Sequence, residues 1–210
     1  MTYEADEPTD PELPGAVAGL LLAAGGGRRL GGRPKALLRH RGRPLVEHAV
    51  RTLRAGGCDP VHVVLGAAAD RVCAEADLTG CVVVDNPHWT QGMGSSLRAG
   101  LTSLAGASAS SALVVLVDQP GIGARAVSRV REAAGASRHA LAAATYAGER
   151  GHPVLLGAAR WPDVAREARG DQGAKGYLKR HQGELVLVEC GDVAEAYDID
   201  VEGDLWRLEG

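Results

Sequence analysis

The chain has 210 residues, which is enough for one α/β domain with a sizeable buried core. Its formal net charge is −3, but residues 1–15 hold five acidic residues and no basic one, so the rest of the chain carries +2. A charge this close to neutral argues against a broad nucleic-acid-binding face and is compatible with a small anionic substrate at a local basic site. No apolar run approaches the roughly 20 residues that cross a bilayer, which argues against an integral membrane role.

Residues 1–15 are expected to form an acidic, disordered tail. Pro8, Pro11 and Pro14 stand among its acidic residues, and the segment is too polar to pack. It also lacks the basic and then apolar order of a secretory signal. We therefore expect a cytoplasmic enzyme with one folded domain over residues 16–210.

Apolar runs alternate with helix-like stretches along that domain. Runs that are apolar on successive residues suit strands covered on both faces, as in a mainly parallel sheet. The pattern predicts a single α/β domain whose mostly parallel central sheet is flanked by helices. Strands are expected at residues 17–22, 61–65, 82–84, 113–117, 141–144, 154–156 and 185–188, and helices at 45–55, 95–104, 124–134, 161–168 and 174–181. The small-residue run 105–112 is expected to be a helix end and a mobile loop. In such a sheet, ligands bind at the carboxyl ends of the strands.

A glycine-rich loop follows the first expected strand, where residues 22–35 read LAAGGGRRLGGRPK. Glycines allow a backbone to approach a ligand closely, so that amide groups point at phosphate oxygens, and Arg29 and Lys35 would neutralise further charge. A Walker loop is excluded because Pro34 precedes the lysine and Ala36 follows it, and a dinucleotide fingerprint is excluded by Leu30. Gly25, Gly26 and Gly27 are expected to supply the backbone donors, and the residues expected to bind the nucleotide at this turn are Leu22, Ala23, Ala24, Gly25, Gly26 and Gly27.

This loop resembles that of the molybdenum-cofactor nucleotidyltransferases, which reads Leu-Ala-Ala-Gly, three variable residues, Arg, an apolar residue, Gly, two variable residues and Lys. The resemblance implies a Rossmann-like GT-A fold. It also implies transfer of a nucleoside monophosphate from a nucleoside triphosphate to an anionic acceptor. The alternative is an ordinary βα loop with surface arginines.

Two acidic positions are candidates for a magnesium site. Asp118 ends an apolar run and precedes Gln119 and Pro120, and Mg²⁺ takes carboxylate oxygens, waters and substrate phosphates. In the family this aspartate is the metal ligand within Asp-Gln-Pro. The resemblance adds Asp200, although the family's Thr-Pro after it is replaced by Val201-Glu202 here. A capping role for Asp200 stays open, as does a turn-forming role for Asp118.

The segment 85–100 contains GMGSSLRAG, which also matches the family. The resemblance places Gly94, Ser95 and Ser96 at the nucleotide, with Asp85 at the ribose or base. Ser95 as a plain helix cap is compatible with that role. Trp89 is expected to pack rather than to stack on a base.

The acceptor is expected in the second half of the chain, where GHPV at 151–154 and GDQGAK at 170–175 match the family. His152 and Lys175 are the candidate acceptor residues. Lys175 in the first turn of a helix is unfavourable unless an anion lies nearby. Asp171 is expected to cap the helix that begins near residue 174.

These matches together favour a Mg²⁺-dependent nucleotidyltransferase with Arg29, Lys35 and Asp118 as its catalytic residues. Leu-Ala-Ala-Gly at 22–25 resembles the cytidylyl-transferring branch, so CTP is expected rather than GTP, with a phosphorylated acceptor such as molybdopterin. Two alternatives stay open. One is an oxidoreductase that holds NAD(P)H or a flavin on the same scaffold, and the other is a nucleotide-binding regulator without catalysis.

Overall fold

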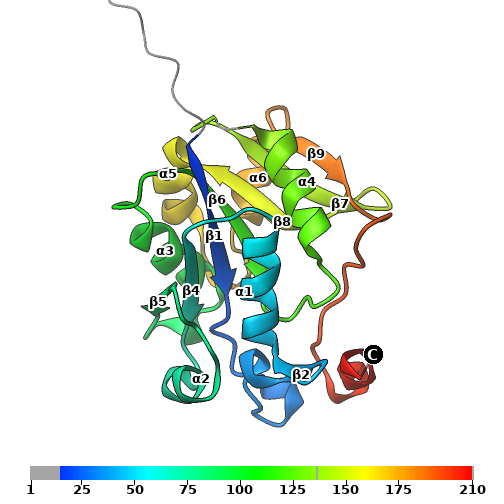
Figure 1. Ribbon diagram of the computed structural model, residues 1–210. Coiled ribbons are helices and arrows are strands. Elements are labelled where there is room, and N and C mark those ends of the chain that lie inside the picture. Colours follow the sequence, from blue (N-terminus) through cyan, green and yellow to red (C-terminus); the bar gives the residue numbers. More distant parts are fainter. Residues whose placement is uncertain (1–14, 136, 210) are drawn as a thin grey trace, which may run out of the picture.

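The computed structural model describes residues 15–135 and 137–209, which form a twisted seven-stranded sheet with helices on both faces (Figure 1). The expected tail at residues 1–15 therefore lies outside the described residues, except for Gly15. The strand order is β5-β4-β1-β6-β8-β7-β9. The strands are β1 (Ala16–Leu22), β4 (Val61–Leu65), β5 (Cys81–Asp85), β6 (Ala109–Leu116), β7 (Leu141–Tyr146), β8 (Glu149–Gly157) and β9 (Val186–Glu189).

The sheet is mostly parallel, as predicted. β1 pairs in parallel with both β4 and β6, and β4 with β5, whereas β8 runs antiparallel to its neighbours β6 and β7. A short separate pair, β2 (Arg39–His40) and β3 (Arg43–Pro44), precedes the first helix. The α/β prediction is confirmed, and all seven expected strands are present.

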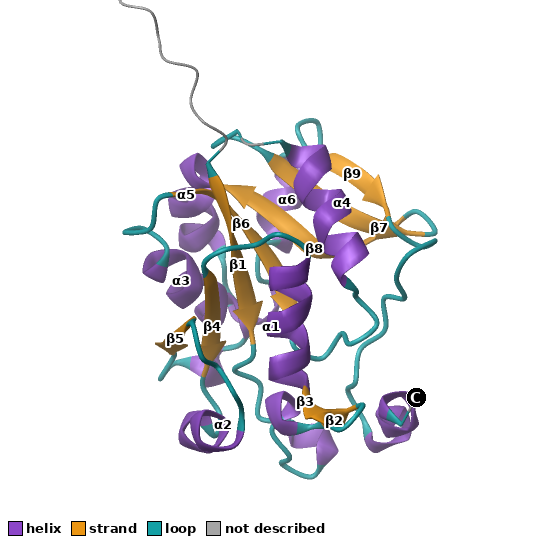
Figure 2. Ribbon diagram, viewed as in Figure 1, coloured by secondary structure: helices purple, strands orange, loops and turns teal. Residues whose placement is uncertain are grey.

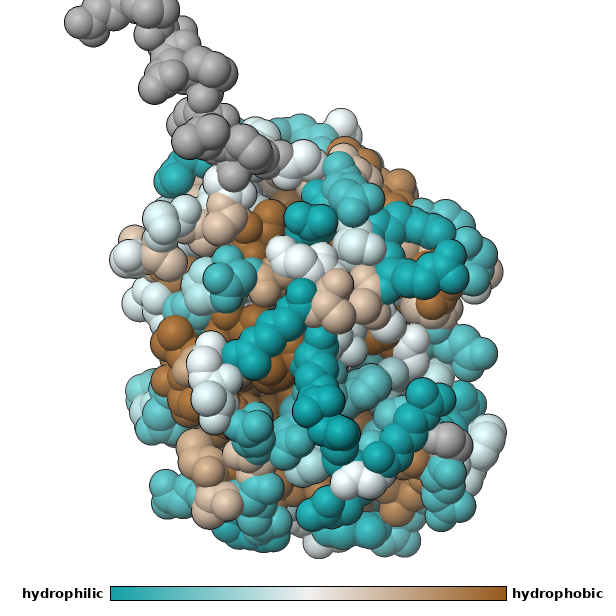
Figure 3. Space-filling view, viewed as in Figure 1, coloured by the Kyte–Doolittle hydropathy of each residue, from teal (hydrophilic) through white to brown (hydrophobic). Residues whose placement is uncertain are grey.

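Helices cover the two faces of the sheet in two groups (Figure 2). α1 (Leu45–Ala55) and α4 (Ala124–Ala134) pack on one face, and α3 (Met93–Ser103), α5 (Trp161–Glu167) and α6 (Lys175–Arg180) pack on the other. α1 buries Leu45, Val46, Ala49, Val50 and Leu53 and turns its polar side outward, so this face of the molecule is largely hydrophilic (Figure 3). Among the described residues, no helix is long and apolar enough to span a membrane.

One local prediction was wrong, and one helix was missed. The run 105–112 is not all loop, because Ala109–Leu116 forms β6, and its small side chains are buried between β1 and β8. Helix α2 (Ala69–Glu75) was not predicted at all, since only Val72 within it is buried and its apolar periodicity is weak.

The C-terminal segment returns to the carboxyl end of β6. Ile199 is fully buried in the same core as α1 and α4, and its amide donates to the carbonyl of Asp118 at 2.9 Å. The chain then ends in a 3₁₀ helix, η6 (Glu202–Leu208). This connection brings residues near position 200 to the end of a strand more than eighty residues earlier in the chain.

Candidate active site

The carboxyl ends of β1 and β6 lie side by side and carry the two strongest sequence candidates. Leu22 and Leu116 are register partners in the parallel pair, the glycine loop follows the first strand, and Asp118 follows the second. Ligands of open α/β sheets bind at this edge. Chain topology therefore brings the loop and the aspartate together.

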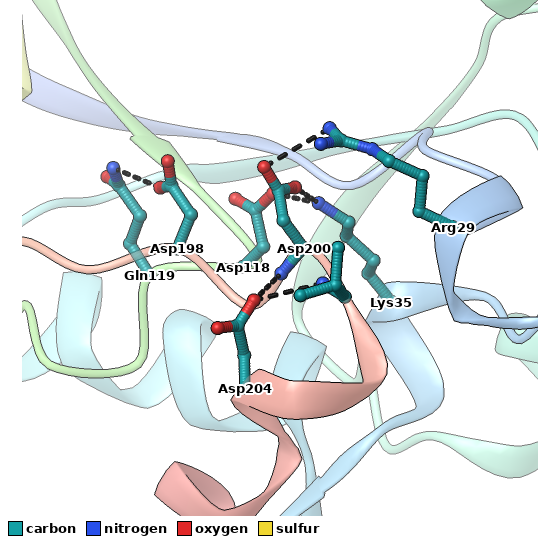
Figure 4. A network of polar contacts seen from close by, with 8 residues as sticks. Arg29, Lys35, Asp118, Gln119, Asp198, Asp200 and Asp204 are labelled. Atoms are coloured by element: carbon teal, nitrogen blue, oxygen red, sulfur yellow. Dashed lines mark hydrogen bonds and ion pairs between the residues drawn. The ribbon is translucent and has the colours of Figure 1, made fainter.

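Lys35 lies between two carboxylates at this edge (Figure 4). Its Nζ donates to Asp118 Oδ2 at 2.6 Å and also to Asp200 Oδ1. Arg29 donates to the other oxygen of Asp200 at 3.2 Å. The side chains of Lys35 and Asp118 are 14% and 19% exposed, so water screens their pairing less than it screens a surface ion pair.

Burial and pairing shift the pKa values of these groups in different directions. Burial raises the pKa of Asp118, although Lys35 acts against this shift. The hydrogen bond from Lys35 lowers the pKa of Asp200, and the charges of Lys35 and Arg29 add to the effect. Burial by itself would lower the pKa of Lys35, but the two aspartates outweigh it and raise that pKa. One ammonium group thus balances two carboxylates, of which Asp118 is the less well compensated.

The side chain of Asp204 fixes the backbone at Asp200. The amides of Asp200 and Val201 both donate to Asp204 Oδ2, at 2.8 and 2.9 Å. Ile199 points into the core while Asp198 and Asp200 face the cavity, as period-two alternation predicts. The helix-capping alternative for Asp200 was wrong, because its two carboxylate oxygens accept from Lys35 and Arg29 and the N-cap of η6 is Val201. The replaced residues 201–203 therefore leave Asp200 in contact with Lys35.

The glycine loop needs glycine at one position in particular. Gly27 has a φ of +61°, and a Cβ there would lie 1.9 Å from the carbonyl oxygen of Arg33. Within the described chain, the amides of Gly25, Gly26 and Gly27 donate no hydrogen bond to the protein. They border the first cavity, a hollow of about 640 Å³ whose walls include Gly26, Arg29, Lys35, Ser96, Asp118 and Asp200. Unpaired donors and cations at one wall are suited to a chain of phosphates.

A divalent cation fits between the two carboxylates. Asp118 and Asp200 both contact the ammonium of Lys35, so their carboxylates converge on one cation, and carboxylate oxygens are the hard donors that Mg²⁺ prefers. The described residues hold no cluster of three or more His, Cys, Asp or Glu side chains that could hold a metal alone. Mg²⁺ needs no such cluster, because it keeps waters and takes substrate phosphates besides one or two carboxylates.

The residues expected at the nucleotide divide into those that line the first cavity and those that do not. Leu22, Ala24 and Ser96 line it, whereas Ala23 is buried in the core. Asp85 is exposed at the end of edge strand β5 and does not line the cavity. Gly94 provides a close contact instead, because a Cβ there would lie 2.6 Å from the amide nitrogen of Arg169.

Asn86, the residue after Asp85, was missed by sequence reasoning. It is 2% exposed, and its Nδ2 donates to Ser95 Oγ at 2.9 Å and to Ser96 Oγ at 3.0 Å. Ser95 Oγ donates to the carbonyl of Gly92 at 2.9 Å, so this residue acts in the turn that starts α3. The sequence offered one signal, an asparagine directly after an apolar strand and its terminal acid Asp85, and only the acid was chosen as a candidate.

Trp89 packs against the glycine loop, as expected. A Cβ on Gly26 would lie 3.2 Å from the Trp89 ring, and one on Gly66 would lie 2.5 Å from its Cβ. The ring also lines the first cavity. Trp89 therefore supports the loop from the side that faces a ligand.

A second cavity of about 310 Å³ adjoins the first and shares the wall residues Leu22, Met93, Leu116, Asp171 and Asp198. His152 and Lys175 both line it. Burial lowers the pKa of His152 to about 4, so its imidazole is neutral. The capping role expected for Asp171 was wrong, because this residue lies in a separate 3₁₀ turn, and Ala174 at the N-cap of α6 has no side-chain bond.

The fold and the site together define a nucleotide-binding α/β domain, and the comparisons with known proteins narrow this class. The profile of the MobA-like NTP transferase domain matches residues 19–185. The chain belongs to this family, whose members use nucleoside triphosphates, typically with divalent metals.

Two curated relatives are similar over different spans. Nicotine blue oxidoreductase of Paenarthrobacter nicotinovorans is 41% identical over 206 residues, which cover 95% of this chain and 98% of that protein. A probable molybdenum cofactor guanylyltransferase of Opitutus terrae is 36% identical over 114 residues, about half of each chain (51% and 50%).

Two solved structures have a similar fold. A homologue of Mycobacterium tuberculosis Rv0371c, from Mycobacterium sp. strain JC1, has a TM-score of 0.76 at 31% identity, covering 91% of this chain and 94% of that one. Rv0371c of M. tuberculosis itself, in complex with manganese, has a TM-score of 0.76 at 26% identity and covers 93% and 99%.

Proposed function

We propose that the protein transfers CMP from CTP to a phosphorylated acceptor such as molybdopterin and releases pyrophosphate. An oxygen of the acceptor phosphate forms a bond to the α-phosphorus, and the bond from that phosphorus to the oxygen bridging to the β-phosphate breaks. A phosphate monoester is already ionised near neutral pH, so the reaction needs positioning and charge stabilisation more than a general base. One observation carries this proposal: unpaired loop amides and a carboxylate pair line the same cavity.

Each group of residues at that cavity has its own role in the proposed reaction. The amides of Gly25 to Gly27 would donate to phosphate oxygens, and Arg29 would stabilise charge on the departing pyrophosphate. Asp118 and Asp200 would hold Mg²⁺, which supplies Lewis-acid stabilisation of the phosphate charge. Lys35, released from these carboxylates, would bind the α-phosphate. Manganese in the complex of Rv0371c supports a divalent ion in this fold.

The preference for CTP rests on Ala24. The resemblance associates Leu-Ala-Ala-Gly with cytidylyl transfer and Leu-Ala-Gly-Gly with guanylyl transfer. The guanylyltransferase of Opitutus terrae is a relative over only half of the chain, so it supports the family more than the choice of base. A thermal-shift panel of the four triphosphates tests that choice, and equal stabilisation by GTP would overturn it. We also propose that the protein acts in the cytoplasm.

Pyrophosphate release tests the reaction itself. Purified protein, Mg²⁺ and molybdopterin are incubated with each triphosphate, and we expect release with CTP. Lys35→Ala should reduce the rate by about 10²-fold, the size of effect for losing one donor to a developing charge. Arg33→Ala is the matched control, because Arg33 lies in the same loop but pairs with exposed Glu202 outside the cavity. A Lys35→Ala variant as active as wild type would contradict the mechanism, and triphosphate binding without turnover would indicate a regulator.

A second candidate, an oxidoreductase, is favoured by one observation. A relative that matches nearly the whole length of this chain, at 41% identity, is named nicotine blue oxidoreductase. On that proposal the first cavity would hold the phosphates of NAD(P)H, and the second cavity would hold the compound that is reduced. Absorption spectra of the purified protein and NAD(P)H binding by calorimetry test it. Tight NAD(P)H binding together with no pyrophosphate release would favour this candidate over the transferase.

A further inference from the structure

Among the described residues, three cations border the first cavity, and they differ in their partners. Lys35 contacts Asp118 and Asp200, and Arg29 donates to Asp200 at 3.2 Å (Figure 4). Arg28 also borders the cavity, but its side chain makes no hydrogen bond, ion pair or ring contact with any described residue. Arg28 is therefore the one described cation at this cavity that can bind an anion without first leaving a carboxylate.

The backbone at Arg28 is fixed, whereas its side chain is not. Arg28 begins a 3₁₀ turn, η1 (Arg28–Leu30), directly after Gly27 in the left-handed conformation. The carbonyl of Gly27 accepts from the amides of Leu30 at 2.8 Å and Gly32 at 3.0 Å, which holds the turn against the glycine loop. Because the Arg28 side chain is exposed and flexible, its guanidinium can reach into the open cavity that its backbone borders.

Arg28 and Arg29 serve different parts of the cavity. Successive side chains of a 3₁₀ turn are about 120° apart, so the two guanidinium groups diverge from neighbouring positions. Arg29 is directed at Asp200, which the proposed function assigns to the metal site. Arg28 therefore extends to a part of the cavity that this carboxylate does not occupy.

Burial sets the order in which this cavity would hold a chain of phosphates. Lys35 and Asp118 are largely buried, whereas Arg28 and Arg29 are exposed at the rim. On the proposed function the reacting α-phosphate lies at the buried pair, and the β-phosphate lies next to it beside Arg29. The third phosphate then lies outermost, within reach of Arg28. A terminal phosphate presents several oxygens, and the planar fork of a guanidinium can bind two of them at once.

We propose that Arg28 is a specificity-determining residue that binds the terminal phosphate of a nucleoside triphosphate and so distinguishes it from a diphosphate or a monophosphate. The inference rests on the proposed function in placing a triphosphate in the first cavity with its α-phosphate at Lys35. It does not depend on the choice of base, because the terminal phosphate is the part of the nucleotide farthest from the base.

Calorimetric titration with CTP, CDP and CMP, each with Mg²⁺ and without an acceptor, tests this role. Arg28→Ala should bind CTP about tenfold more weakly than wild type does, the loss expected for one charge-assisted contact at an exposed position. The same variant should bind CDP and CMP as wild type does. Arg28→Lys should lose less affinity for CTP, because it keeps the charge but not the fork. Unchanged affinity of Arg28→Ala for CTP would overturn the inference.

A control variant separates a contact from long-range attraction. Arg33→Ala removes the same charge from the same loop, but Arg33 pairs with Glu202 and does not line the first cavity. This variant should bind all three nucleotides as wild type does. A loss for CTP as large as that of Arg28→Ala would mean that the charge of the loop, and not a contact of Arg28, attracts the nucleotide. An equal loss for CTP and CDP in Arg28→Ala would likewise contradict the inference, because a general attraction weakens both.

Nucleotide binding and the proposed transfer can fail independently. A protein in which Arg28→Ala loses affinity for CTP alone, but which releases no pyrophosphate with any triphosphate, would retain the inference and lose the transferase proposal. A protein that releases pyrophosphate while Arg28→Ala binds CTP as tightly as wild type does would retain the proposal and lose the inference. Wild-type protein that binds CTP no more tightly than CDP would also overturn the inference.

Discussion

The two cavities share a wall but differ in how they are built. The first is lined by backbone amides and charged side chains from loops at the ends of β1 and β6 and from the C-terminal segment. The second is lined mostly by aliphatic side chains of β6, β8, α3 and α6. A site of the first kind recognises charge and metal, whereas the second recognises shape and a small number of hydrogen bonds. If the second substrate binds in the second cavity, as proposed, such a division would let one family keep its nucleotide chemistry while the second substrate changes.

Asp118→Asn gives the largest expected effect and separates function from stability. Loss of the carboxylate should lower pyrophosphate release by about 10³-fold, because a neutral amide holds a divalent cation poorly. Burial raises the pKa of Asp118, so the folded protein loses stability as pH rises from the ordinary value of 3.8 through that higher pKa. At neutral pH the free energy of unfolding of Asp118→Asn should therefore lie no more than about 1 kcal/mol below that of wild type, or should exceed it.

The free energy of unfolding, from denaturant titration, and the rate of pyrophosphate release are measured on the same preparation of Asp118→Asn. A strongly destabilised variant would mean that the pairing with Lys35 outweighs the burial of Asp118. The ion pairs that line the first cavity would then serve stability rather than function, and the functional contrast between the two cavities would disappear.

Gly27→Ala tests the backbone of the first cavity. Its positive φ and the close carbonyl of Arg33 should force the loop to shift, and CTP binding should weaken by about 10- to 100-fold. Gly25→Ala is the matched control, because a Cβ at Gly25 meets nothing within 4 Å and the amide donor is retained. Calorimetric titration of both variants with CTP and Mg²⁺ should separate them. Equal loss in both would mean that the glycines act through flexibility rather than through geometry.

The difference between the cavities also explains what the sequence could predict. The glycine loop and Asp118 are encoded locally, as a short motif and as an acid after an apolar run, so they could be recognised without a structure. Asp200 was found through the family resemblance. The contact between Gln119 and Asp198 joins residues 79 positions apart, and no local pattern indicates it.

The second cavity was less predictable because it depends on packing. An apolar run such as Val154 to Leu156 reads the same in either direction, so the antiparallel course of β8 could not be inferred. The loop before α6 was misread for a related reason. Asp171 precedes a helix, but Gly173 adopts a positive φ of 49° and separates the 3₁₀ turn from α6, so the acid caps nothing there.

His152 gives the smallest expected effect, and it tests whether the second cavity is as apolar as its walls indicate. Burial lowers the pKa of the imidazole from 6.5 to about 4 in the folded protein, with Arg150 adding to the shift and Asp198 opposing it. Between these two pH values the unfolded chain binds a proton that the folded protein does not, so stability falls as pH decreases from 6.5 to about 4.

His152→Gln should remove that part of the pH dependence, so its free energy of unfolding relative to wild type should rise by about 2 kcal/mol on going from neutral pH to pH 4. This is less than the full pKa shift implies, because the imidazole is partly open to the cavity. His139→Gln, at an exposed position, is the control and should follow the wild-type curve. If His152→Gln also followed the wild-type dependence of stability on pH, the imidazole of His152 would be as well hydrated as a surface histidine. The second cavity would then be a polar site like the first.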